Sequence, residues 1–159
     1  MFIRRFLPLF PILLLSLLLP VVGGQAAPVA EWSPAGSLNA ADGGALHHFG
    51  AAVAIDGDTA IVGAPGWPSA PNARPGAAYV FTHNGTAWVQ RTRLTANDGQ
   101  HGDGFGNSAV LVGNVLVVGA VSARRGNPGD PNIAYGVGAV YSYTGSGATW
   151  TQETKLMPA

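Results

Sequence analysis

The chain contains no cysteine, and only 10% of its 159 residues are charged. The absence of cysteine excludes disulfides and a lipid-modified N-terminal cysteine, so stability has to come from burial and backbone hydrogen bonds. The eight basic residues equal the eight acidic ones in number. This balance gives no reason to expect nucleic acid or an anionic membrane surface as a partner. Glycine is abundant instead, at 23 residues, and this Gly-rich composition with its β-branched residues excludes a helical solenoid.

The N-terminal segment has the pattern of a secretory signal peptide. Arg4 and Arg5 precede an apolar run over 6–22, and the small residues Gly24 and Ala26 follow at the two positions that a signal peptidase reads. An uncleaved membrane anchor is the rival interpretation, but the run is near the short limit for a span and three prolines interrupt it. We expect residues 1–26 to be removed and the protein to be secreted, extracellular or on the cell surface, with the periplasm as an alternative. No membrane contact is expected after cleavage.

Two long segments of the chain repeat. "LNAADGGALHHFGAAVAIDGDTAIVGAP" begins at Leu38, and "LTANDGQHGDGFGNSAVLVGNVLVVGAV" begins 56 positions later at Leu94. A second block, "GAAYVFTHNGTAWVQRTRL" from Gly76, returns 62 positions later as "GAVYSYTGSGATWTQETKL" from Gly138. The pattern Trp, five residues, Leu also occurs upstream at 32–38. The chain therefore holds two full units and one preceding partial unit.

Each unit reads as four short strands. The first two, at 51–55 and 59–64 and again at 108–112 and 115–120, are almost wholly apolar and flank Gly-Asp or Gly-Asn turn signals. Such apolar runs suit strands that are covered on both faces. The third strands, 77–81 and 139–143, are rich in aromatics, and the fourth, 88–94 and 150–156, alternate apolar and polar residues. Hydrophobicity thus falls from the first strand to the last, as expected if the first strand lies near a central axis and the fourth lies at the outer rim of the fold.

This pattern predicts an all-β fold made of β-propeller blades, each with four antiparallel strands. The expected division is an outer strand of a preceding blade at 27–37, one blade at 38–94 and a second at 95–159. An eight-stranded sandwich is the alternative, but it would not need a repeated sequence. A closed propeller takes about four to eight blades. We therefore expect an incomplete propeller, either a fragment of a longer chain or a protomer that needs further blades or self-association to complete a ring.

The repeated residues resemble the FG-GAP repeat, the blade unit of the integrin alpha-subunit propeller, in the version found in secreted bacterial proteins. The resemblance covers about residues 32–159. In the second copy Val121 replaces the proline of the motif. The motif positions are Phe49, Gly50, Gly63, Ala64 and Pro65 in the first copy, and Phe105, Gly106, Gly119 and Ala120 in the second.

Calcium is implied by this resemblance, because many such repeats hold it in the hairpin between the first two strands. That hairpin offers Asp56 and Asp58 in the first unit and only Asn114 in the second. Ca²⁺ typically takes about six to eight oxygens. The loops of this chain therefore do not support the site, and we expect no metal and no other cofactor.

The stretch "DGQHGDGFG" at 98–106 also looks like a metal loop, with two aspartates, a histidine and four glycines. The equivalent stretch of the first unit, 42–50, argues against that interpretation. His47 occupies the position of Asp103 there, and only Asp-Gly and Phe-Gly recur. We expect Asp-Gly to supply a capped turn whose glycine takes a positive φ. Phe-Gly is expected to supply a buried ring beside a position where another backbone approaches.

Loops on one face are the expected binding region. The loops between second and third strands, 65–75 and 121–137, should share a face with the links between units, and loops on a rigid scaffold commonly carry function. Arg124 and Arg125 are suited to a carboxylate or sulfate, although a solvated, proline-braced loop is the plainer interpretation. The candidate interaction residues are Arg124, Arg125, Asp130 and Tyr135.

Other candidates have plainer structural explanations. His47 and His48 are adjacent, so on an extended segment they point apart and fit one metal ion poorly. Trp32, Trp88 and Trp150 have the residue type that stacks on sugars, but their fixed repeat positions favour packing within the blade.

Two functions follow as expectations. The first is a secreted or cell-surface module that binds an unknown protein or carbohydrate, as in adhesion. The alternative is a set of non-catalytic blades of an extracellular propeller hydrolase or lyase. No nucleophile–base pair, phosphate loop or zinc pattern occurs in the sequence, so we do not expect this chain itself to be an enzyme.

Overall fold

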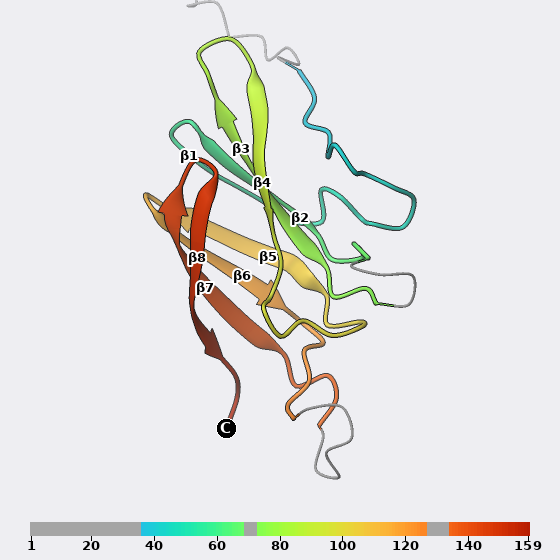
Figure 1. Cartoon of the computed structure of the whole chain (residues 1–159). Coiled ribbons are helices and arrows are strands. Elements are labelled where there is room, and N and C mark those ends of the chain that lie inside the picture. Colours follow the sequence, from blue (N-terminus) through green and yellow to red (C-terminus); the bar gives the residue numbers. More distant parts are fainter. Residues whose placement is uncertain (1–35, 69–72, 127–133) are drawn as a thin grey trace, which may run out of the picture. The chain divides into compact units, whose positions relative to one another are not determined.

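The computed structural model describes residues 36–68, 73–126 and 134–159, and these residues form two four-stranded antiparallel sheets (Figure 1). Each sheet has its strands in sequence order. No helix in the described residues is long and apolar enough to cross a membrane. The first sheet contains β1 (Val53–Asp56), β2 (Thr59–Ala64), β3 (Ala77–His83) and β4 (Trp88–Leu94). The second contains β5 (Phe105–Val112), β6 (Val115–Ala120), β7 (Ala139–Ser146) and β8 (Thr149–Leu156).

The internal repeat extends to details of backbone geometry. The β1–β2 and β5–β6 hairpins both turn on a glycine with positive φ, Gly57 at 52° and Gly113 at 56°, as tight two-residue turns favour. The register of β3 with β4 shifts between Val80 and Phe81. The register of β7 with β8 shifts at the matching point, between Ser142 and Tyr143. The two sheets are therefore two copies of one structural unit.

The main core lies between the two sheets. One face of the first sheet contributes Ile61, Ala78 and Val80, which pack with Leu111 and Leu116 of the second sheet. Phe105 lies fully buried in the same cluster and makes edge-on contacts with the rings of Tyr141 and Tyr143. A second, smaller cluster covers the other face of the first sheet. Leu38, Ala40 and Phe49, from the segment before β1, pack against it. Its buried members are Ala60, Val62, Ala64, Trp67, Ala77, Tyr79 and Phe81.

At the Phe-Gly motif of the second unit the backbones of the two sheets lie in close contact. Phe105 forms a parallel bridge with Gly76, and its amide donates to the carbonyl of Pro75 at 2.8 Å. A Cβ on Gly106 would lie 2.1 Å from the carbonyl oxygen of Ala77, and one on Gly63 would lie 1.9 Å from that of Gly106. The expected close backbone approach at Phe-Gly is thus confirmed for this copy.

The tryptophans pack as the repeat predicts. Trp88 lies against the cluster of the first sheet, and Trp150 lies against the core between the sheets. Trp32 lies outside the described residues.

The expectation that the first two strands of each unit are covered on both faces is wrong for β1, β5 and β6. β2 is buried along nearly its whole length, because it has one core on each side. In β1, by contrast, Val53 and Ile55 are 64% and 62% exposed. β6 alternates buried and partly open positions. Only the faces turned toward the neighbouring sheet or a covering link are buried, and an apolar sequence does not reveal whether such a neighbour is present.

The role predicted for Asp-Gly also needs correction. Gly43 and Gly99 have no positive φ; each is the last residue of a turn and donates to the carbonyl of Ala40 or Ala96. Glycine is common at that position of a type I turn without needing special φ. Positive φ falls instead at three alternate positions further along each link. These are Leu46, His48 and Gly50 in the first link and Gly102, Gly104 and Gly106 in the second.

Several strand boundaries differ from those expected, including the ends of β3 and β7 and the starts of β1 and β5. β1 begins at Val53, two residues later than the apolar run suggests. β5 begins at Phe105, three residues earlier, because Phe105 pairs with Ala120 across an irregularity that ends at Ser108. An irregularity of this kind breaks the alternation from which a strand is recognised.

Candidate functional site

The links between units and the loops between second and third strands meet on one face, as the sequence predicted. The amide of Gly102 donates to the carbonyl of Arg74 at 2.9 Å, and the amide of Arg74 donates to Nδ1 of His101 at 3.2 Å. In the second unit Ser122 donates to the carbonyl of Asp103 at 2.9 Å. We call this surface, formed by 38–50, 65–68, 73–76, 95–104, 121–126 and 134–138, the loop face.

The aspartate of each Asp-Gly turn sits in a repeated polar cluster at the loop face. Asp42 accepts a hydrogen bond from the Tyr79 hydroxyl at 2.8 Å and one from Trp67 Nε1 at 3.2 Å, and it pairs with Arg93. In the second unit Asp98 accepts from the Tyr141 hydroxyl at 3.0 Å and from Lys155 Nζ at 2.6 Å. Each cluster thus ties a link to the third and fourth strands of its own sheet. The second-unit members are Asp98, Tyr141 and Lys155.

These contacts shift the ionisation of both partners. Desolvation acts to raise the pKa of Asp42, but hydrogen bonds from Tyr79 and Trp67 and the charge of Arg93 together lower it below its ordinary value. The pKa of Asp98 is lowered in the same way, against desolvation, by Lys155 and Tyr141. Burial, with the neighbouring aspartate, raises the pKa of the tyrosine hydroxyls. The aspartates are therefore held ionised and the tyrosines protonated, as donors.

Sequence reasoning missed this cluster, although its signal was present. Tyr79 and Tyr141 are 62 positions apart, as are Arg93 and Lys155, and both pairs follow the offset of the second repeated block. An aspartate, a tyrosine and a basic residue recur at equivalent positions of the two units, and this recurrence could have revealed the polar cluster.

The second aspartate of "DGQHGDGFG" has a different environment and no copy. Asp103 is 2% exposed, and its Oδ2 accepts from the amide of Gln100 at 2.7 Å. Its Oδ1 faces Arg124 Nε at 3.7 Å, and within the described residues neither of these two atoms has a hydrogen-bond partner. Burial raises the pKa of Asp103, against the Gln100 hydrogen bond and the charge of Arg124, which lower it. Asp98 thus contacts Tyr141 and Lys155, whereas Asp103 contacts Gln100 and Arg124.

Arg124 and Tyr135 come together at the loop face. The guanidinium of Arg124 lies over the Tyr135 ring, 5.1 Å from its centroid, and one of its NH groups donates to the carbonyl of His101 at 2.6 Å. The Tyr135 side chain is 70% exposed. Arg125 does not join them; its backbone bridges to Ala134, and its side chain donates to the carbonyl of Pro158. Asp130 lies outside the described residues.

One of the two acidic hairpin positions, Asp56, is used in a contact between the sheets. Asp56 Oδ2 accepts from the amide of Gly113 at 2.6 Å, so the β1–β2 hairpin is tied to the β5–β6 hairpin. In the described part of the chain there is no group of three or more histidine, aspartate or glutamate side chains placed to hold a metal ion. His47 has a buried Nδ1, and His48 takes a positive φ of 55°.

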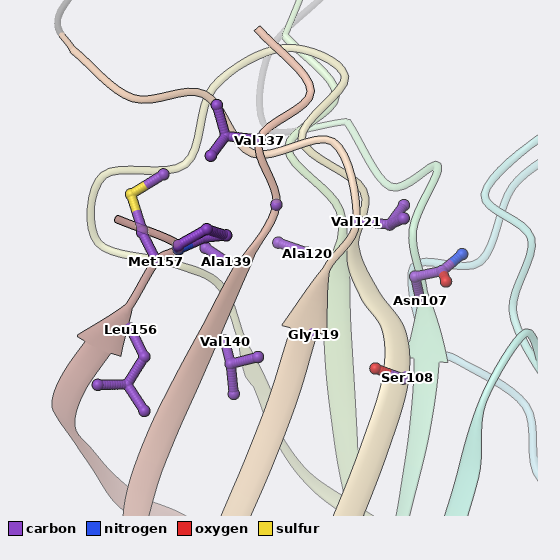
Figure 2. Close-up of a pocket in the computed structure, with 12 residues that line it drawn as sticks. Asn107, Ser108, Gly119, Ala120, Val121, Val137, Ala139, Val140, Leu156 and Met157 are labelled. Atoms are coloured by element: carbon purple, nitrogen blue, oxygen red, sulfur yellow. The ribbon is translucent and has the colours of Figure 1, made fainter. Parts of the chain in front are cut away.

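A pocket of about 570 Å³ opens at the loop-face end of the second sheet. Figure 2 shows Leu156 and Met157 on one side, Ser108 on the other, and Gly119 and Val140 between them. The pocket lies on the face of the second sheet that is turned away from the first. Its lining is mainly apolar and includes the motif positions Gly119 and Ala120.

Two repeated four-stranded antiparallel sheets, packed face to face with a shared core, are blades of a β-propeller. Residues 32–81 and 88–143 each match the family profile of the FG-GAP repeat, and the chain belongs to the FG-GAP repeat family. A comparison with curated proteins gave no match. The motif residues Phe49–Gly50 and Phe105–Gly106 lie within the two matched segments.

Proposed function

We propose that this chain is a secreted or cell-surface propeller module whose loop face binds an anionic group on a protein or carbohydrate, as an adhesive protein does. The observation that carries the proposal is the pairing of Arg124 with the exposed ring of Tyr135. Arginine and tyrosine are, with tryptophan, enriched among the residues that contribute most to binding at protein interfaces. The planar guanidinium also suits a carboxylate or sulfate.

The position of this pair supports binding. Arg124 is anchored through His101 and Asp103, so its orientation is set before a ligand arrives. In this proposal the chain binds without catalysis, because the nearby carboxylates already serve structural contacts. Asp98 accepts from Tyr141 and Lys155, and Asp103 accepts from the Gln100 amide.

Binding can be tested with heparin, polygalacturonate and a collagen-coated surface as immobilised probes. Tyr135→Ala and Arg124→Ala should each weaken binding to the recognised probe about tenfold, which corresponds to ~1.4 kcal/mol. Arg91→Ala removes the same charge from an exposed position of β4, outside the loop face, and should leave binding unchanged. No binding by the native chain to any probe, or equal binding by all variants, would contradict the proposal.

Export is the second part of the proposal, and Arg4 and Arg5 followed by the apolar run support it. Cleavage after Ala26 gives a mature chain that begins at Ala27. N-terminal sequencing of the protein recovered outside the cell tests this directly. A recovered chain that keeps residues 6–22 would show that the segment is an anchor instead.

A further inference from the structure

The outer face of the second sheet, turned away from the first sheet, is apolar and open. Val110, Val140 and Leu156 on this face are 59%, 39% and 61% exposed. The pocket in Figure 2 lies at the loop-face end of the same surface. We call this surface the outer face and define it by Val110, Gly119, Val140 and Leu156. An open apolar face of this kind marks an interaction surface.

In the first sheet, the face equivalent to the outer face is covered by the second sheet. Ala54, Ala78 and Leu94 match Val110, Val140 and Leu156 in the repeat, and all three pack into the core beneath the second sheet. Ala78 is fully buried and Leu94 is 8% exposed. The outer face is therefore a second copy of a surface that is already an interface within this chain.

The pocket corresponds to the place where Phe105-Gly106 sits on the first sheet. There Gly63 and Gly76 let the Phe105-Gly106 backbone approach, since a Cβ on either would clash with it. Gly119 and Gly138, their equivalents, line the pocket. The pocket thus has glycines where an incoming Phe-Gly backbone needs them.

The other half of the interface is also present and open, at the start of the first unit. Gly50 has a φ of 95°, close to the 91° of Gly106, but a Cβ on Gly50 would meet nothing within 4 Å. Ile55 is 62% exposed, whereas its equivalent Leu111, packed on the first sheet, is 7% exposed. Val53 is 64% exposed beside it. We call Gly50, Val53 and Ile55 the leading edge.

We propose that the outer face of one copy of this chain receives the leading edge of a second copy. The contact repeats the one between the two sheets, with Gly50 entering the pocket as Gly106 enters its site on the first sheet. A second copy is the favoured occupant because one chain carries both complementary halves in open form. Such a contact is head-to-tail, so copies add in one direction until a ring closes or a filament grows.

The native chain, expressed at full length, is first examined by sedimentation velocity between about 1 and 100 µM, the range of a moderate interface. Its average mass should rise with concentration. Leu156→Lys on the outer face and Ile55→Lys on the leading edge should each remain monomeric. Ala87→Lys places the same charge at an exposed position of the β3–β4 turn, outside both surfaces, and should associate like the native chain. Circular dichroism confirms that each variant is folded.

Mixing the two monomeric variants gives the decisive result. Leu156→Lys keeps an intact leading edge and Ile55→Lys keeps an intact outer face, so the mixture should form dimers and nothing larger. A native chain that stays monomeric, or a folded mixture that does not dimerise, would overturn the proposal. So would association that Leu156→Lys abolishes and Ile55→Lys does not, because that pattern indicates a different occupant of the outer face. Gly50→Ala should weaken association without changing the fold of the second sheet.

Discussion

At the scale of single residues, the aspartates of the two Asp-Gly turns act as ties between a link and the strands of its sheet. Asp98 is half exposed, yet both of its oxygens are engaged, one by Tyr141 and one by Lys155. A neutral amide in its place keeps the shape but loses the charge that both donors favour. The contribution is modest because solvent screens a half-exposed pair.

Asp98→Asn should therefore destabilise the protein by about 1 kcal/mol at pH 7. The lowered pKa of Asp98 means that its stabilisation is present above the ordinary carboxyl range and is lost as the pH falls through the folded-state pKa. The difference between native and variant should thus close in acid. Denaturant unfolding between pH 7 and pH 3 measures it. Asp58→Asn, on the exposed β1–β2 turn, is the charge-matched control and should have little effect.

Asp103 should behave in the opposite sense. Its pKa is raised by burial, so the folded state binds the proton more tightly than the unfolded chain does. The ionised form thus carries a penalty above the folded-state pKa, and this penalty is relieved as the pH falls. Asp103→Asn should raise stability by about 1 kcal/mol at pH 7, with the gain shrinking in acid. A gain that grows on acidification in the same unfolding series would contradict this assignment.

At the scale of elements, the two links share one backbone path but differ in how well their residues suit it. Positive φ occurs at Leu46 and His48 in the first link and at the matching Gly102 and Gly104 in the second. Side chains other than glycine cost about 1 kcal/mol in this conformation. The first link is therefore strained where the second is relaxed.

Leu46→Gly should stabilise the protein by up to about 1 kcal/mol, because Leu46 is 64% exposed and little packing is lost. The control is Ala51→Gly, an exposed position directly after this link with no positive φ, where glycine should only destabilise. Thermal melting of both variants checks the sign. Equal losses in the two would show that Leu46 is not strained.

The Phe-Gly glycines allow a matched pair of substitutions. Gly106→Ala and Gly50→Ala impose nearly the same φ strain, but only the first places a Cβ against backbone, 2.1 Å from the carbonyl of Ala77. Gly106→Ala should therefore be the more destabilising by about 2 kcal/mol, the range of overpacking. Both are measured by denaturant unfolding at a concentration where the chain is monomeric. Similar losses would show that the sheets adjust freely at this contact.

The strands and turns could be predicted from the sequence because their signals are local. Apolar runs around Gly57 and Gly113 define the hairpins without reference to the rest of the chain. The polar cluster of Asp98 could not be predicted in this way, since its partners Tyr141 and Lys155 lie on two other strands. The exposure of Val53 and Ile55 escaped prediction as well, because it depends on which neighbour covers β1.

At the scale of the whole molecule, the core between the sheets makes them one folding unit. Ile61, Val80, Leu111 and Leu116 pack in one cluster, so each sheet loses the burial of the face that it turns toward the other if that other sheet unfolds. Two-state unfolding is the expectation for a small domain with one main core. The repeat also supplies an internal control, since Ile55 occupies in β1 the position that Leu111 occupies in β5.

Leu111→Ala should cost about 2–4 kcal/mol, because Leu111 is 7% exposed and its removal leaves a cavity between the sheets. Ile55→Ala removes a side chain of similar size from a 62% exposed position and should cost less than about 0.5 kcal/mol in the monomer. Trp88 packs in the first sheet and Trp150 near the second, so single-tryptophan versions of the chain report on each sheet. Leu111→Ala should lower the unfolding midpoint by the same amount for both reporters. A shift seen by Trp150 alone would mean that the first sheet keeps its fold without the second. The shared core would then stabilise only one of the two blades.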